Sequence, residues 1–431
     1  MEIKQTEKLL KNRNYILLFL GGLVSRTGNN IHYIAITWFV LELTGSGTAT
    51  GTLLLLASLP WVLMGPISGI VVDRVNRKAI IVSMDILRGL IVLWLGWTVY
   101  SGIAGFTHLA IATILTSSCG AFFDPAVTAT IPNIVSDKNL QQANSYEQLS
   151  YQLTTIIGAA LGGVLLAAVG VAGAMFLNGV SFLLSAFSEL FIDIPPLKNS
   201  SRTGTGYLED LKAGGSFIYG SKPLFSLFGI SVLMNFLCSG VISVGLPYLF
   251  KEVLQVSSRL YGFAQSPIAI GAMLGAILLS FLPEVKNYYR TLGITITMQT
   301  LALLSLSIPI LPAVISRYQS NYIYISLLIL LFILGVFNAL GNIPIMVLLQ
   351  RMIPDDIRGR VFALLTAFNT GLVPVSMLLS GWLLDTIPAY SLFMGAGLIM
   401  GLVLLFAFRI KAIKDINNYA AGSVSPSTDA M

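Results

Sequence analysis

Long apolar runs, separated by short polar segments, repeat along the whole chain. Each run has about 20 residues or more, the length that an α-helix needs to cross roughly 30 Å of hydrocarbon. The runs are continuous and do not alternate between apolar and polar positions, so they predict helices and not the strands of a membrane barrel. The pattern predicts twelve membrane-spanning helices, over residues 15–43, 50–72, 79–100, 108–131, 149–169, 172–194, 224–250, 259–283, 291–312, 321–349, 361–386 and 390–411.

The longest polar connection, from Pro195 to Pro223, divides these spans into two sets of six. It contains a short amphipathic stretch from Tyr207 to Tyr219. The polar segment after the last span has no apolar periodicity and is predicted to be disordered. The predicted parts are a six-helix bundle over residues 1–194, a cytoplasmic linker over 195–223, a second six-helix bundle over 224–411 and a disordered cytoplasmic tail over 412–431.

The basic residues are concentrated in the loops of one face of the predicted bundle. Of the 25 Lys and Arg residues, twenty fall on the side of the N-terminus, three in loops on the opposite side and two within spans. Positively charged loops stay in the cytoplasm, so both termini are predicted to be cytoplasmic. Only 10% of the residues are charged, whereas a soluble protein has about 25%. We therefore predict a multi-pass protein of the cell (plasma or inner) membrane.

Several other function classes are excluded by the same sequence. The net charge of +6 lies in short membrane loops, which argues against a nucleic-acid partner. Cys119 and Cys238 both lie in apolar spans, which excludes a disulfide scaffold or a Cys-based zinc site. The sequence contains no nucleotide-binding P-loop, zinc-protease motif or nucleophile elbow. We expect a transporter with no cofactor and no bound metal, and not an enzyme.

The loop between the second and third spans has the pattern G-x-x-x-D-R-x-x-R-K. Gly69 would let two helices approach closely, and Asp73 could accept hydrogen bonds from the N-terminus of a neighbouring helix. The cations Arg74, Arg77 and Lys78 could bind carboxylates or lipid headgroups. Ordinary cytoplasmic charge would explain the cations but neither Gly69 nor Asp73, so we interpret this segment as a gating loop. The pattern resembles the signature loop of the major facilitator superfamily.

More of the chain resembles the branch of that superfamily that contains macrolide-efflux and enterobactin-exporter-like proteins. The resemblance implies two six-helix bundles around a central cavity, alternating access, and in many members export driven by proton exchange. The chain departs from the pattern of this branch at three positions: Asn29 replaces an Asp, Thr116 replaces an Arg and Ala159 replaces a Pro. Because of these departures, the resemblance does not identify the coupling ion. The resembling pieces are Ser25–Asn29, Leu43–Ser46, Asp85–Arg88, Phe122–Ala126, Ala143–Asn144, Gly158–Gly163 and Pro354–Phe362.

The central cavity of this fold is lined by spans one, four, seven and ten. Arg26 lies inside the first span, and an Arg at this depth marks a functional site unless it has a structural partner. Asp124 on span four is the best-placed carboxylate; it could take part in proton coupling or form a structural bridge with Arg26. Each cavity Asn could instead make an ordinary interhelical hydrogen bond. The predicted cavity residues are Arg26, Asn29, Asn30, Tyr33, Asp124, Asn235, Asn338 and Asn342.

Three further groups complete the predicted site. Asp85 and Arg88, at positions i and i+3 of span three, are expected to form an intrahelical pair. The loop after span ten is the counterpart of the gating loop, although a solvated loop is the simpler interpretation. The gating set is Gly69, Asp73, Arg74, Arg77, Lys78, Asp85, Arg88, Asp355, Arg358 and Arg360, and the helix-packing set is Gly158, Gly162 and Gly163.

These features predict a secondary active transporter that works by alternating access. The favoured function is proton-coupled efflux of an amphipathic small molecule, such as a drug, a macrolide-like compound or a siderophore. One alternative is uptake or facilitated diffusion of a polar metabolite, and another is a non-transporting membrane receptor or assembly partner. The expected partners are a small-molecule substrate, a proton or another coupling ion, and membrane lipids, and the protein is expected to be monomeric.

Overall fold

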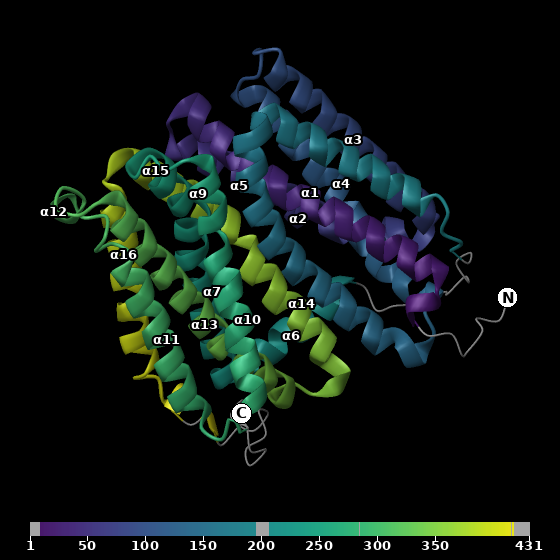
Figure 1. Cartoon of the computed structure of the whole chain (residues 1–431). Helices are drawn as coiled ribbons and strands as arrows, with labels where there is room; N and C mark the ends of the chain where they lie inside the picture. Colours follow the sequence, from purple (N-terminus) through teal and green to yellow (C-terminus); the bar gives the residue numbers. More distant parts are fainter. Residues whose placement is uncertain (1–8, 195–206, 284, 415, 418–431) are drawn as a thin grey trace. The chain divides into compact units, whose positions relative to one another are not determined.

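The computed structural model describes residues 9–194, 207–283, 285–414 and 416–417, and every regular element in them is a helix (Figure 1). The first part of the predicted linker, 195–206, and most of the predicted tail, 418–431, lie outside the described residues. The amphipathic stretch of the linker is helix α6, Tyr207–Gly220.

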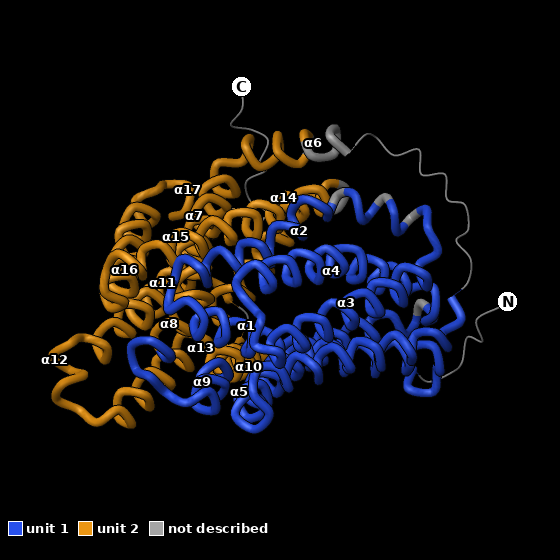
Figure 2. Tube along the Cα trace, turned by 90° about the horizontal axis from the view of Figure 1, so that it is seen from above, with its two compact units in different colours: residues 1–201, 250–266 blue, residues 202–249, 267–431 orange. Residues whose placement is uncertain are grey.

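The chain forms two compact units (Figure 2). Unit 1 comprises residues 1–201 and 250–266, and unit 2 comprises residues 202–249 and 267–431. The predicted first bundle therefore also holds a segment from the second half of the chain. This segment packs on unit 1 through polar and close backbone contacts: the Tyr261 and Thr37 hydroxyls lie 3.0 Å apart, and Gly262 lies against Gly163.

Unit 1 contains helices whose ends follow standard capping chemistry. The Asn12 side chain accepts a hydrogen bond from Tyr15 N at the start of α1, and Gly45, with φ of 59°, ends that helix. Asn76 caps α3 in the same way. The helices of unit 1 are α1 (Arg13–Thr44), α2 (Gly47–Arg74), α3 (Arg77–Tyr100), α4 (Phe106–Ile134), α5 (Asp137–Glu189) and α9 (Ser258–Ala264), preceded by the 3₁₀ turn η1 (Leu9–Lys11).

Helix α5 contains two predicted spans in one run of 53 residues. A straight helix of this length would measure about 80 Å, far more than a membrane is thick. The run is broken at Gly170, whose φ of 70° and ψ of −177° suit glycine. Both arms lie along α1, because Arg26 contacts Glu147 of the first arm and Gly28 packs against Ser181 of the second.

Unit 2 holds most of the second six-helix bundle. The ninth predicted span ends early, because α11 stops at Ser305 and Pro309 and Pro312 follow. The helices of unit 2 are α6, α7 (Lys222–Gly240), α8 (Leu246–Tyr248), α10 (Ser266–Phe281), α11 (Tyr288–Ser305), α12 (Pro312–Ile315), α13 (Ser320–Met352), α14 (Asp355–Gly371), α15 (Val373–Thr386), α16 (Ala389–Ala407) and α17 (Lys411–Lys414), with the π-helical turn η2 (Val241–Gly245) before α8. A second π-helical turn, η3 (Leu249–Val253), follows α8 and belongs to unit 1 from residue 250 on.

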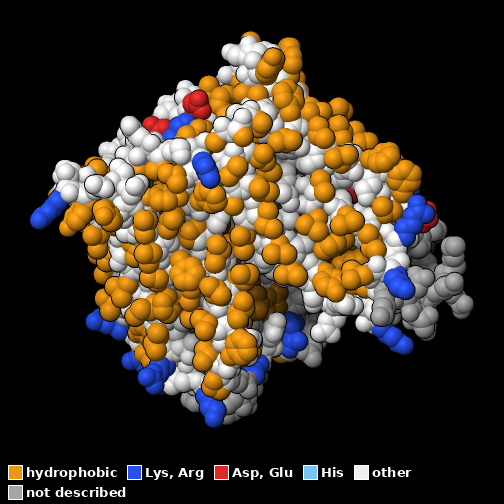
Figure 3. Space-filling model, viewed as in Figure 1, with side chains coloured by type: hydrophobic (Ala, Val, Ile, Leu, Met, Phe, Trp, Pro, Cys, Tyr) orange, Lys and Arg blue, Asp and Glu red, His pale blue; other side chains and the backbone are white. Residues whose placement is uncertain are grey.

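The predicted twelve spans all fall on these helices. Within the described residues, nine helical stretches are long and apolar enough to cross a membrane. One of them, Lys138–Glu189, supplies two crossings, and α1 and α11 complete the twelve. Hydrophobic side chains cover much of the visible face, and Lys and Arg lie mainly at its edges (Figure 3). The twelve-helix, all-α prediction is confirmed.

The start of the predicted tail is ordered, which corrects the disorder prediction for residues 412–414 and 416–417. Ile413 and Ile416 are buried, and they anchor this short stretch. The Asn417 side chain accepts a hydrogen bond from Tyr288 N at 2.7 Å and donates one to Asn287 Oδ1 at 3.1 Å. Burial of two isoleucines and satisfied polar groups hold the segment on α11.

Candidate functional site

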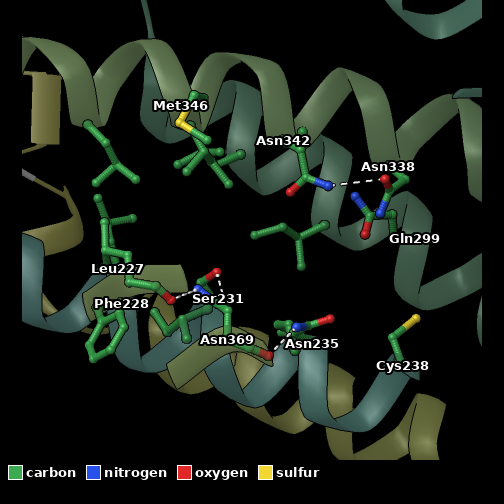
Figure 4. A pocket seen from close by; sticks show the side chains of 18 of the residues that line it. Leu227, Phe228, Ser231, Asn235, Cys238, Gln299, Asn338, Asn342, Met346 and Asn369 are labelled. Atoms are coloured by element: carbon green, nitrogen blue, oxygen red, sulfur yellow. Dashed lines mark hydrogen bonds between the residues drawn. The ribbon is translucent and has the colours of Figure 1, made fainter. Parts of the chain in front are cut away.

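A cavity of about 440 Å³ lies within unit 2, between α7, α11, α13 and α14 (Figure 4). Aliphatic, phenylalanine and methionine side chains supply much of its wall, and hydroxyl groups come from Ser231, Thr366 and Thr370. No Asp, Glu, Lys or Arg is among the described residues that line it. Its polar character comes mainly from five amide side chains, those of Asn235, Gln299, Asn338, Asn342 and Asn369.

One wall of this cavity is a hydrogen-bonded set that joins α7 to α14. Asn235 Nδ2 donates to the Asn369 carbonyl oxygen at 2.6 Å, and Ser231 Oγ donates to Asn369 Oδ1 at 3.3 Å. Ser239 Oγ donates to Asn235 Oδ1 at 2.8 Å. Asn235 therefore makes the interhelical bond that we considered as its alternative role, and it lines the cavity as well.

The opposite wall comes from α13 and α11. Asn342 Nδ2 donates to Asn338 Oδ1 at 3.1 Å, and both side chains are exposed. Gln299 Nε2 donates to the Phe337 carbonyl oxygen at 2.9 Å. Exposed amides at a cavity wall retain free donor and acceptor positions, because each amide has two donors and two lone pairs.

The three asparagines predicted for the second half therefore lie in one cavity. Gln299 and Asn369 line it too but were missed, because only spans seven and ten were considered as sources in this half. Both amides lie inside apolar runs, and that contrast is the signal that could have found them.

Arg26 in unit 1 has a different partner from the one considered in the sequence analysis. Its Nη2 lies 2.5 Å from Glu147 Oε2, and its Nη1 donates to Ser150 Oγ at 3.1 Å. The bridge to Asp124 is not formed; Asp124 is exposed on α4. The reason is that α1 packs along α5, which brings Arg26 to Glu147 near the start of that helix.

The other predicted residues of span one divide between two environments. Asn30 faces α5, where its Cβ lies against Gly158, and its amide donates to the Arg26 carbonyl oxygen at 2.9 Å. Tyr33 is half-buried, whereas Asn29 is exposed. Asn29 thus remains available to a ligand, and Asn30 has a packing role in this structure.

Asp85 and Arg88 form the predicted intrahelical pair, with 3.4 Å between Arg88 Nη1 and Asp85 Oδ1. They belong to the bundle interior and not to the exposed loop, since Asp85 is 0% and Arg88 6% exposed. The Arg88 guanidinium lies over the rings of Phe123 and Phe182, at 4.8 and 5.5 Å from their centroids. Asp85 and Arg88 therefore lie in the bundle interior and not in the gating loop to which we assigned them. The structure contains the expected pair.

The gating loop is held chiefly by Arg77. Its Nη1 donates to the Ala129 carbonyl oxygen at 2.7 Å and its Nε to the Val72 carbonyl oxygen at 3.4 Å. Arg74 is exposed, and Lys78 lies in the first turn of α3. A Cβ at Gly69 would meet no described atom within 4 Å. The Asp73 side chain lies outside the described residues.

In the counterpart loop, Arg358 binds the end of α13. Its Nη2 donates to the carbonyl oxygens of Gln350 and Ile353, at 2.9 and 3.2 Å. Free carbonyl groups at a helix C-terminus attract cations, which explains the position of this guanidinium. Arg360 is half-buried, and the Asp355 side chain lies outside the described residues.

The three predicted packing glycines lie where backbones approach closely. A Cβ at Gly158 would lie 2.5 Å from Asn30 Cβ, and one at Gly162 would lie 3.0 Å from Ile34 Cγ1. A Cβ at Gly163 would lie 2.6 Å from the Gly262 Cα. Small residues let these backbones approach.

Comparison with known proteins agrees with this architecture. The chain is 23% identical over 411 residues to the multidrug efflux pump Tap of Mycolicibacterium fortuitum, which covers 92% of this chain and 96% of that protein. It is 28% identical over 292 residues to an uncharacterized MFS-type transporter, YvqJ, of Bacillus subtilis (strain 168), covering 66% of this chain and 68% of that protein.

Solved transporter structures share the fold at lower sequence identity. A bacterial homologue of the iron transporter ferroportin, in an inward-facing state, has a TM-score of 0.70 and 17% identity, covering 94% of this chain and 100% of that chain. The nucleoside transporter NupG has a TM-score of 0.70 and 12% identity, covering 92% of this chain and 99% of that chain. The family model described as Transmembrane secretion effector matches residues 8–428. The chain therefore belongs to this family of major facilitator transporters.

Proposed function

We propose that this transporter exports an amphipathic small molecule by alternating access, driven by proton exchange across the cell membrane, and that it acts as a monomer. The observation that carries the proposal is the uncharged cavity of unit 2, with five amides set in an apolar wall. An apolar wall favours the hydrocarbon part of a ligand, and amides bind its hydroxyl, carbonyl or amine groups. No charged side chain lines the described cavity, so a lipophilic cation whose charge is spread over aromatic rings meets no repelling cation there, and its amino groups can donate to the amide oxygens.

The relationship to Tap supports efflux as the direction. That relative is named a multidrug efflux pump, and the match extends over 92% of this chain. Drug pumps accept ligands of varied shape, which suits a wall in which methionine and amide side chains can adapt. Met234, Met346 and Met400 all line the cavity.

The proposal is tested in inverted membrane vesicles with ethidium as the probe. An acidic vesicle interior should drive ethidium inward in vesicles that contain the protein, and collapsing the pH gradient should release it. Asn369→Ala should reduce the rate several-fold. Asn133→Ala is the matched control, because Asn133 and Asn369 each donate to the carbonyl oxygen four residues earlier, but only Asn369 lines the cavity. Equal transport rates for the two variants would show that this cavity is not the substrate site.

A second candidate function is facilitated diffusion of a polar neutral metabolite. The five amides favour it, because they offer more hydrogen-bonding groups than a largely hydrocarbon ligand could use. Proteoliposomes containing a mixture of labelled neutral sugars and nucleosides would distinguish the two. Exchange of a labelled metabolite without any pH gradient, together with no movement of ethidium, would favour the metabolite.

A further inference from the structure

Two acidic side chains are buried together in the interior of unit 1. Asp85 on α3 is 0% exposed, and Glu189 at the end of α5 is 1% exposed. The hydroxyl of Ser185, which is also fully buried, donates to Glu189 Oε1 at 3.2 Å. Asp85 lies one turn before Gly89 on α3, and α3 packs on this part of α5, because a Cβ at Gly89 would lie 2.8 Å from Leu183 Cδ2.

Arg88 is the cation of this interior. It pairs with Asp85 Oδ1, and its guanidinium lies between the rings of Phe123 and Phe182. Its electrostatic field also reaches Asp124 on α4. Because an Arg stays protonated under all ordinary conditions, it supplies one positive charge to a group of acids.

The other helices that pack here add no further cation among the described residues that contact the acids. Helix α4 contributes Cys119 and the exposed Asp124, and α2 contributes Trp61, which lies against Gly120. On α1, Gly21 lies against Ser185. Arg26 of α1 is already paired with Glu147.

One oxygen of each acid has no hydrogen-bond partner. Asp85 Oδ2 and Glu189 Oε2 are both buried and unsatisfied. Two ionised carboxylates that share a dry site repel each other, and a single cation cannot balance both. The Ser185 hydroxyl carries only one hydrogen, which it donates to Glu189, so it cannot donate to Asp85 at the same time.

We propose that Asp85, Ser185 and Glu189 form the binding site for the coupling proton. This site deepens the proposed function, since it rests on proton exchange. In the described state the proton is on Glu189, and Asp85 is ionised and paired with Arg88. The interior then holds one positive and one negative charge, so no second carboxylate is buried ionised beside the Asp85–Arg88 pair.

The arrangement also provides a route for proton release. When Arg88 turns from Asp85 toward Asp124, Asp85 loses its cation. Glu189 then turns its O–H toward Ser185 Oγ, and the Ser185 O–H turns from Glu189 toward Asp85. The Glu189 O–H bond breaks as its proton passes to the Ser185 oxygen, and the original Ser185 proton forms a new O–H bond on Asp85. Ser185 is unchanged, Glu189 becomes ionised, Asp85 becomes neutral, and the total charge is conserved.

Infrared difference spectroscopy tests the site without any transported substrate. The full-length protein in lipid nanodiscs is titrated with acid and base, and the carbonyl band of protonated buried carboxyl groups is followed. We expect a band at neutral pH that disappears in Glu189→Gln. Glu147→Gln is the matched control on the same helix, and it should keep the band because Glu147 pairs with Arg26 and lies outside the proposed proton site. A band that survives unchanged in both Glu189→Gln and Asp85→Asn would overturn the proposal.

Transport of ethidium into vesicles distinguishes a failure of the proposed proton site from a failure of the proposed efflux function. Glu189→Gln should retain exchange of ethidium down its own gradient and lose the accumulation driven by a pH gradient. If the wild type moves no ethidium but the infrared band follows Glu189, the proton site stands and the substrate proposal fails. If Glu189→Gln still accumulates ethidium in response to a pH gradient, the efflux proposal stands and the proton site is wrong.

Discussion

Arg26 and Glu147 form an ion pair of 2.5 Å between Nη2 and Oε2 that joins α1 to the first arm of α5. The pair is partly buried, with side-chain exposures of 28% and 15%. Solvent screening weakens such a pair relative to a fully buried one. Because the pair lies inside a bundle of membrane-spanning helices, loss of one partner nevertheless strands a charge among apolar groups.

We expect Glu147→Ala to lower the unfolding free energy by about 1–2 kcal/mol, since the Arg26 guanidinium loses its only carboxylate contact in the described structure. The double variant Arg26→Glu with Glu147→Arg should recover part of that loss. Thermal unfolding of purified protein in detergent measures both. Asp124→Asn should leave the melting temperature unchanged, and a drop as large as that of Glu147→Ala would restore Asp124 as the structural partner.

The sequence predicts the fold here because a hydrocarbon solvent imposes a simple rule. Every backbone polar group must be satisfied within a helix, so each apolar run of sufficient length becomes one. Two departures follow from interactions that are not periodic. The prolines after Ser305 end α11 early, and two isoleucines order the start of the tail.

The candidate site is only partly predictable, because partner choice depends on how helices rotate about their axes. Arg26 and Asp124 have complementary charges and similar predicted depths, yet α1 turns its Arg toward α5. Glu189 was not predicted as a site residue, because it lies near the end of a predicted span, although it is 1% exposed. A hydropathy pattern gives the depth of a residue, whereas the neighbour that it meets is decided by side-chain packing.

The glycine contacts lead to a stability prediction with an internal control. Gly163→Ala should destabilise the protein by about 1–3 kcal/mol, because the new Cβ would lie 2.6 Å from the Gly262 Cα and the backbones would have to separate. Gly69→Ala meets no described atom within 4 Å, and alanine is the better helix former by about 1 kcal/mol. Melting temperatures should therefore fall for the first variant and hold or rise for the second. The opposite order would contradict the close contact.

The gating loop gives a prediction about transport and not only about stability. Asp73→Asn should slow ethidium efflux at least several-fold while abundance in the membrane stays near that of the wild type, because the variant retains the size of the side chain and loses only its charge. Immunoblotting of membranes and vesicle transport are measured on the same preparation. Efflux at the wild-type rate would mean that the loop serves only to set the membrane orientation.

Substitutions of Arg77 and Arg74 distinguish two roles of cations in the gating loop, which are to stabilise the structure and to set the membrane orientation. Arg77→Gln should lower the melting temperature, since the carbonyl groups of Ala129 and Val72 lose a charged donor, and such bonds contribute about 1.5–3 kcal/mol each. Arg74→Gln should have little effect, because Arg74 is exposed. Equal losses in the two variants would show that total positive charge, and not the Arg77 contacts, stabilises the loop.

The segment 250–266 gives the last prediction, because it ties the second half of the chain to unit 1. Lys251 Nζ donates to the Trp38 carbonyl oxygen at 3.0 Å and lies 4.5 Å from the centroid of the Trp38 ring. Its distance to Glu42 Oε2 is 3.8 Å, and Glu42 is 56% exposed. The ring contact is therefore the better shielded of the two, and we expect it to contribute more.

A double-mutant cycle between Trp38→Leu and Lys251→Met should give a coupling free energy of about 0.5–2 kcal/mol in denaturant unfolding. The cycle between Glu42→Gln and Lys251→Met should give less, and its value should fall further as salt is added, because exposed charges are screened. A larger coupling to Glu42 than to Trp38 would contradict this ranking. In that case an exposed ion pair, and not the indole ring, would hold the Lys251 side chain on α1.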